Sequence, residues 1–226
     1  MRFYRLAIGD PLHDGDFADW DEFSLLEDST VTRNLHVAFG VPSRDAVDAW
    51  WRSLVDAGYE SDGEPGPRPQ YSASYYGGFV CDPDGNSVEA VHHETTRGAG
   101  VDHLWLRSRD VAAQRQFYET AAPIVGIRLA QARDKFAHFR FTDRTGSFSF
   151  VADGAPATEN LHLAFGVGDR ATVEEFHRTL TGAGYRDNGA PGERPRYHPG
   201  YYGAFVLDPD GANVEAVFHD RQDRPL

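Results

Sequence analysis

The chain of 226 residues lacks features that would place it in several large classes of protein. It has a single cysteine, Cys81, so it cannot form an intramolecular disulfide, which fits a reducing compartment. No apolar run approaches the roughly 18 to 20 residues of a membrane span. The N-terminal segment has no basic stretch followed by an apolar one, as a signal peptide would. We therefore expect a cytoplasmic protein with no membrane partner.

Positive charge is also scarce. The chain has 35 acidic side chains against 22 lysines and arginines, a net charge of -13. Proteins that bind nucleic acids need basic patches that displace counterions from phosphates, so we expect no nucleic-acid partner. The P-loop, GxGxxG, CxxC and GxSxG motifs are absent as well. Nucleotide binding and serine or cysteine nucleophiles therefore have little support.

A long internal repeat dominates what the chain does contain. Residues 34–93 return as residues 160–219 without a gap, and 34 of the 60 aligned residues are identical. NLHVAFGV corresponds to NLHLAFGV, and SYYGGFVCDPDGNSVEAV corresponds to GYYGAFVLDPDGANVEAV. Each copy carries a histidine and a glutamate 53 residues apart: His36 with Glu89, and His162 with Glu215. Self-similarity of this extent indicates repeated structural units.

Each copy is predicted to form a strand, a helix and three further strands. In the second copy, Asp169 is expected to cap the helix, and the DPDG segment is interpreted as a tight turn because Pro and Gly favour one. A more distant version of the same plan lies between the copies, with a helix that begins at Asp110. For the second copy we expect strands over 161–167, 201–207 and 213–218, a helix over 171–183, a strand from 185 and a Gly/Pro-rich turn over 189–195.

The segment before the first copy is shorter than the segment before the second. We expect strands over 3–8 and 22–26, because EFSLLED stands where SFSFVAD stands later. The predicted domains are an incomplete one over 1–96 and a complete one over 101–220, with a short linker between them. Either translation starts further upstream or a neighbouring subunit completes the first domain, so a homodimer stays open.

Paired βαβββ modules with HLAF at a strand start and DPDGxxVEAV at the end resemble the vicinal oxygen chelate superfamily. That superfamily includes glyoxalase I, extradiol dioxygenases, fosfomycin-resistance enzymes and bleomycin-binding proteins. The resemblance covers essentially the whole chain and implies an α+β fold of tandem βαβββ modules in two domains, the first lacking its N-terminal strand and helix. Because one scaffold hosts many functions, the resemblance specifies the fold more closely than the reaction.

The superfamily takes metal ligands from the first and last strands of paired modules, which implies His103, His162 and Glu215 on this chain. Two histidines and a carboxylate leave positions open for a chelating substrate and suit Fe2+, Mn2+, Zn2+ or Ni2+. The alternative for each histidine is a hydrogen-bonded structural residue. His36 and Glu89 have no equivalent of His103 in the predicted first domain, so we expect that site to be incomplete.

Three further residues are candidates for moving protons: His198, Tyr201 and Tyr202. His198 has Ser72 as its counterpart, and a residue that differs between otherwise similar copies is a candidate for a working group. His198 to Glu215 is similar to an extradiol dioxygenase pattern, although Phe205 stands where those enzymes carry a tyrosine. The alternatives are an exposed loop histidine and tyrosines that pack.

The resemblance therefore implies a metal-dependent enzyme, either a dioxygenase or a glyoxalase-like isomerase or lyase. Its substrate would be a small molecule that chelates the ion through adjacent oxygens. A second interpretation is a non-catalytic protein that sequesters an aromatic drug or metabolite, as bleomycin-binding relatives do; the aromatic content of 13% supports it. A structural partner module is a third interpretation, without positive support from any residue.

Overall fold

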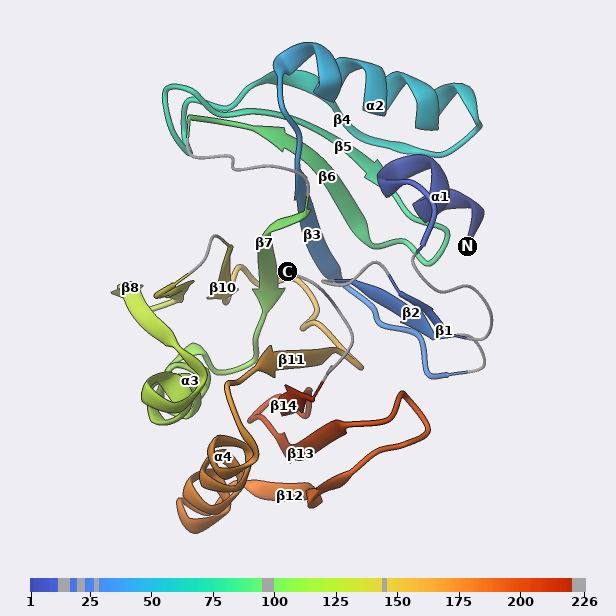
Figure 1. Cartoon of the computed structure of the whole chain (residues 1–226). Helices are drawn as coiled ribbons and strands as arrows, with labels where there is room; N and C mark the ends of the chain where they lie inside the picture. Colours follow the sequence, from blue (N-terminus) through green and yellow to red (C-terminus); the bar gives the residue numbers. More distant parts are fainter. Residues whose placement is uncertain (12–16, 20–22, 27–28, 95–99, 144–145, 221–226) are drawn as a thin grey trace. The chain divides into compact units, whose positions relative to one another are not determined.

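The structure, a computed structural model, describes residues 1–11, 17–19, 23–26, 29–94, 100–143 and 146–220 (Figure 1). The chain divides into two compact units, residues 1–106 with 145–148 and residues 107–144 with 149–226. Three βαβββ modules follow one another along the chain, as the sequence predicts. None of the helices in the described ranges has the length and apolar character that crossing a bilayer requires.

The first unit is built on one module whose strands run in the order β4-β5-β6-β3, with β7 next to β3. Strand β3 is parallel to β6 and antiparallel to β7. Helix α2 packs on β4, β5 and β6 (Figure 1). Its buried residues are Val47, Trp50 and Leu54. The elements are α1 (Arg2–Ile8), β1 (Phe17–Asp19), β2 (Ser24–Leu26), β3 (Leu35–Gly40), α2 (Arg44–Asp56), β4 (Ser61–Pro67), β5 (Tyr76–Cys81), β6 (Ser87–His92) and β7 (Gly100–Arg107).

The strand predicted over residues 3–8 is wrong, because these residues form helix α1. Phe3 packs edge-to-face on Tyr59, with ring centroids 4.9 Å apart. The Tyr4 hydroxyl donates a 2.8 Å hydrogen bond to Asp82. Both aromatic side chains are buried, so tertiary packing holds a helix of only seven residues that would not be stable alone. Strand β2 covers the last three residues of the strand predicted over 22–26. Its first residue and residues 97–99 of the linker lie outside the described residues.

The same contacts recur in the second unit and identify what α1 is. Phe117 packs edge-to-face on Tyr185 at 4.7 Å, and the Tyr118 hydroxyl donates to Asp208 at 3.4 Å. Tyr185 and Asp208 are the repeat counterparts of the residues that α1 contacts. Helix α1 therefore corresponds to the Phe-Tyr segment of helix α3 (Val111–Val125), for which no counterpart was expected before the first copy.

The second unit contains a four-stranded sheet in the order β11-β14-β13-β12, in which β11 is parallel to β14. Helix α4 packs on this sheet, and α3 packs on α4. The third module supplies all four strands of this sheet. The unit also contains β8, β9 and most of β10, which belong to the second module. The elements are α3 (Val111–Val125), β8 (Ile127–Arg133), β9 (Phe136–Phe141), β10 (Ser147–Val151), β11 (His162–Gly166), α4 (Arg170–Gly182), β12 (Arg186–Glu193), β13 (Tyr201–Leu207) and β14 (Asn213–His219).

The predicted helix starts and the DPDG turn are confirmed. Asp110 accepts a hydrogen bond from the Ala113 amide at 3.0 Å, and Asp169 accepts one from the Thr172 amide at 2.7 Å, as N-cap residues do. The 208–211 turn closes with a 2.9 Å bond between its first and last residues. The strands predicted over 161–167, 201–207 and 213–218 appear as β11, β13 and β14.

The Gly/Pro-rich turn predicted over 189–195 is mostly wrong, because β12 continues to Glu193. Two register shifts between β12 and β13, between Asp187 and Gly189 and between Gly189 and Gly192, accommodate the residues that favoured a turn. Gly189 has a φ of 156°, and a Cβ there would press on Phe205. Glycine at this position thus forms a bulge within a strand and does not end it.

Candidate metal centre

Three neighbouring strands of the first unit place Glu89, Ala38 and His103 in one row. Ala38 lies opposite Glu89 in the β3–β6 pair and opposite His103 in the β3–β7 pair. His36 precedes Ala38 by two residues, and side chains two apart on a strand share a face. The register therefore brings His36, Glu89 and His103 onto one face of the sheet.

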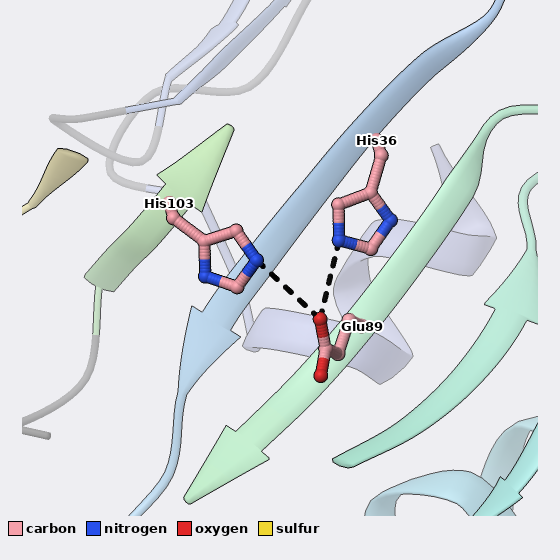
Figure 2. Close-up of side chains that lie close together, drawn as sticks. All are labelled: His36, Glu89 and His103. Atoms are coloured by element: carbon pink, nitrogen blue, oxygen red, sulfur yellow. Dashed lines mark hydrogen bonds and ion pairs between the residues drawn. The ribbon is translucent and has the colours of Figure 1, made fainter. Parts of the chain in front are cut away.

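The ligand atoms of these three residues converge. His36 Nε2 lies 3.1 Å from Glu89 Oε2, and His103 Nε2 lies 3.6 Å from the same oxygen. Figure 2 shows both imidazole rings directed at this oxygen. All three ligand atoms lie within 4.8 Å of one another, and no other group of three His, Cys, Asp or Glu residues does so in the part of the chain that the structure describes. The cluster is the candidate functional centre.

Glu89 is buried, with 1% of its surface exposed, so its carboxylate needs compensation. The Tyr75 hydroxyl donates a 2.8 Å hydrogen bond to Oε1, which leaves Oε2 for the histidines. Burial and the negative charge of Glu89 raise the pKa of the Tyr75 phenol well above its ordinary value, so it stays protonated and donates. Gly77 makes room for the carboxylate, because a Cβ at that position would collide with Oε1.

A second set of contacts orients the two imidazoles. His36 Nδ1 lies 3.1 Å from the Ser87 hydroxyl, and His103 Nδ1 lies 2.9 Å from Asp102 Oδ1. Asp102 also bonds His93 Nε2 at 3.1 Å. Burial opposes ionisation of Asp102, but the hydrogen bonds from His103 and His93 outweigh it and hold the pKa of this carboxyl below its usual range. The carboxylate is thus ionised and fixes the ring of His103 through Nδ1.

A β-bulge explains how two consecutive residues both reach the centre. Ala38 pairs with His103 and Phe39 pairs with Val101, so Asp102 is the extra residue of β7. In a regular strand Asp102 and His103 would point to opposite faces, whereas a bulge redirects a side chain. Strand alternation therefore does not predict Asp102 at the centre. The signal in the sequence was the Asp-His pair itself.

The donor atoms fit a divalent cation. Because Asp102 is a carboxylate, His103 donates to it from Nδ1–H, and His103 Nε2 then presents a lone pair. That lone pair faces Glu89 Oε2 at 3.6 Å. Two acceptors at this distance repel each other unless a positive charge or a proton lies between them. Two imidazole nitrogens and one carboxylate oxygen are a common ligand set for first-row transition metals.

The structure groups the predicted ligands differently from the sequence analysis. His103 lies in the first unit with His36 and Glu89, because β7 pairs with β3. His162 and Glu215 lie in the second unit, where His162 Nε2 is 2.9 Å from Glu215 Oε2. The first copy, whose site was expected to be incomplete, thus has three convergent donors. Within the described residues the second copy has its pair alone.

The three predicted proton-moving residues lie in the second unit and contact different partners. The Tyr201 hydroxyl donates to Glu215 Oε1 at 2.8 Å, as its counterpart does in the first copy. His198 Nε2 lies 2.9 Å from His219 Nδ1. Tyr202 points to the other side of β13, where its hydroxyl donates to Glu174 of α4 at 3.1 Å. Tyr201 and His198 are therefore close to the second His–Glu pair, and Tyr202 contacts helix α4.

Comparison with known proteins agrees with this architecture. The family model described as Glyoxalase/Bleomycin resistance protein/Dioxygenase superfamily matches residues 10–90 and 100–216. Glyoxalase I from Zea mays is similar in structure, with a TM-score of 0.64 and 18% identity over 96% of this chain and 86% of that one. A variant of that enzyme gives a TM-score of 0.68 and 20% identity with the same coverage.

A Bacillus subtilis protein provisionally described as a dioxygenase is also similar, with a TM-score of 0.58 and 16% identity over 82% of this chain and 61% of that one. No curated protein sequence matches the chain. At these identities the structural likeness speaks for the fold alone. The predicted α+β fold of tandem βαβββ modules is confirmed.

Proposed function

The chain belongs to the glyoxalase/bleomycin resistance protein/dioxygenase superfamily, and from that premise we propose that it is a metal-dependent enzyme whose ion is held by His36, Glu89 and His103. Three ligands from one protein leave coordination positions free for a small molecule that chelates through adjacent oxygens. The reaction is ring-cleaving dioxygenation or a glyoxalase-like isomerisation or lyase step. The ion is Fe2+, Mn2+, Zn2+ or Ni2+.

One observation carries the proposal: two imidazole Nε2 atoms point at a single oxygen of a buried carboxylate. If the histidines had a purely structural role, a hydrogen bond from one of them to this oxygen would be enough. Here Tyr75 already satisfies the other carboxylate oxygen, and both Nδ1 atoms have partners of their own. The three remaining ligand atoms, which are the two Nε2 atoms and Glu89 Oε2, are oriented toward one another and are suited to a shared cation.

The surrounding residues would keep these donors in their ligating form. Asp102 holds the proton of His103 on Nδ1, and the Tyr75 phenol keeps its proton directed at Glu89 Oε1. Ser87 contacts His36 Nδ1 and so directs His36 Nε2 toward Glu89. When bound, a divalent ion on such a set polarises coordinated substrate oxygens or binds dioxygen.

The duplication offers a matched test of this site. The full chain is stripped with a chelator, reloaded with each of the four ions and measured for metal content and for the metal-induced rise in melting temperature. We expect His36→Ala and His103→Ala to lose most of the bound metal and the rise in melting temperature, because a ligand stabilises the folded chain less when it binds more weakly. His162→Ala, the same change in the other copy, should keep both.

Two results would contradict the proposal. One is equal metal loss in His162→Ala and His36→Ala, which would place the ion elsewhere. The other is saturable binding of an aromatic ligand by a chain that takes up no metal, which would favour sequestration. With the loaded protein, oxygen uptake in the presence of a catechol separates a dioxygenase from an isomerase or lyase.

A further inference from the structure

Two arginines face each other on the outer strands of the second module. Arg128 on β8 pairs directly with Arg140 on β9. Like charges opposite each other in a sheet are destabilising. This chain has more acidic than basic residues, so acidic side chains that could neutralise the two arginines are plentiful. Yet neither guanidinium makes an ion pair with an acidic side chain among residues 1–11, 17–19, 23–26, 29–94, 100–143 and 146–220.

The two side chains border a hollow. It has a volume of about 410 Å³ and is lined by Arg128, Ala130, Gln131, His138 and Arg140. Both arginines are exposed and Ala130 is small, so the hollow is open to a solute. The Gln131 side chain adds an amide donor to this lining. Its polar lining thus consists chiefly of hydrogen-bond donors.

Hydrogen bonds through His138 fix the position of Arg140. Arg140 donates from Nε to His138 Nε2 at 3.0 Å, and His138 Nδ1 lies 2.9 Å from the hydroxyl of buried Ser149. Because Nε2 of His138 accepts, its proton is on Nδ1 and is donated to Ser149. The His138 ring is also stacked parallel to Phe136. These contacts occupy Arg140 Nε and leave its two terminal NH2 groups available.

We propose that this hollow is a binding site for the oxyanion of a small molecule, a carboxylate or a phosphate. Two guanidinium groups supply the positive charge, and the terminal donors of Arg140 match the two oxygens of such a group. An oxyanion between Arg128 and Arg140 would also remove their mutual repulsion. The site does not depend on the proposed metal, since none of its residues belongs to the metal centre.

The test uses the full chain without metal, titrated with inorganic phosphate and with acetate at constant ionic strength. Binding is followed by calorimetry and by the NMR signals of the arginine Nε–H groups. We expect saturable binding of at least one probe, weakened about tenfold or more by Arg128→Gln. Arg140→Lys keeps the charge but loses the planar donors, and it should weaken binding to a similar extent.

Arg133→Gln is the control, because it removes one exposed arginine from the same strand outside the hollow. It should change affinity less than twofold. Binding of phosphate alone, of acetate alone or of both identifies the ligand class and supports the site in each case. Absence of saturable binding, or equal weakening by Arg133→Gln and Arg128→Gln, would overturn it. All three arginines are exposed, so the variants are expected to fold, and circular dichroism checks this.

Discussion

A single inserted residue shapes the candidate metal centre. Asp102 is the extra residue of the β7 bulge, and its carboxylate bonds both His103 and His93. His93 in turn stacks on Tyr75, with ring planes 12° apart, and Tyr75 bonds Glu89. His103 and Glu89 are thus connected through a continuous set of contacts. Such outer contacts determine which tautomer of a histidine is available to an ion.

Asp102→Asn tests this role. The amide can still accept from His103 but carries no charge, so the preference for a proton on His103 Nδ1 weakens. We expect metal affinity to fall about 10- to 100-fold, with all three ligands still present. The visible absorption spectrum of the Co2+-loaded protein should change in band position, because the orientation of His103 changes.

The control is Asp45→Asn, which removes one exposed carboxylate from the first turn of α2 in the same unit. It should leave both the affinity and the Co2+ spectrum unchanged. An Asp102→Asn protein that bound metal as the parent does would show that the bulge carboxylate has only a structural role.

At the scale of elements, the β13–β14 turn is fixed by one buried carboxylate. Asp208 accepts from the amides of Asp210 and Ala212, both at 2.9 Å, and from the hydroxyl of Tyr118. These bonds tie the turn to helix α3. Burial raises the pKa of the Asp208 carboxyl above its ordinary value, although the hydrogen bonds act in the opposite direction.

The raised pKa predicts a pH dependence of folding. A carboxyl whose pKa is higher in the folded chain favours folding most below its unfolded pKa of about 3.9. That contribution is lost as pH rises through the folded pKa. Asp208→Asn carries no charge and lacks this loss. The free energy of unfolding of the variant, relative to the parent chain, should therefore increase between pH 4 and pH 7.

Urea denaturation at each pH measures this difference. Comparing two chains that differ at one position cancels the titration of the remaining acids. A difference that stayed constant with pH would contradict the assignment of a raised pKa to Asp208. A difference that decreased with pH would reverse its sign and indicate that the hydrogen bonds outweigh burial.

The elements that local sequence controls were predicted well. Asp110 and Asp169 cap helices, and Pro and Gly form the DPDG turns, because each of these preferences acts within a few residues. Helix α1 was mistaken for a strand because its seven residues are too few to show a helical pattern. Its stability comes from the burial of Phe3 and Tyr4 against distant residues. The β12 bulges were mistaken for a turn because glycine favours both.

For the whole molecule, the two copies of the repeat are expected to differ in metal binding. In the first copy His36 joins a group of three donors, and its side chain is 14% exposed. In the second copy His162 pairs with Glu215 alone among the described donors, and its side chain is 46% exposed. Two ligands rarely hold a catalytic ion.

We therefore expect about one tightly bound ion per chain, as two donors seldom suffice. Elemental analysis of the reloaded protein at known concentration measures this ratio. A ratio near two, reduced to one by His162→Ala, would show that the second copy also completes a site. A ratio near one that His162→Ala does not change would agree with the first copy as the site.

The sequence alone determined the modules and the His–Glu pair of each copy. Within each copy the histidine and glutamate lie on a parallel strand pair, β3 with β6 and β11 with β14, because one repeated pattern folds in one way. Only the tertiary structure decided which pair His103 joins. Strand alternation shows which face a side chain occupies but not which distant strand lies beside it. The pairing of β7 with β3 settled that choice, and its bulge added Asp102.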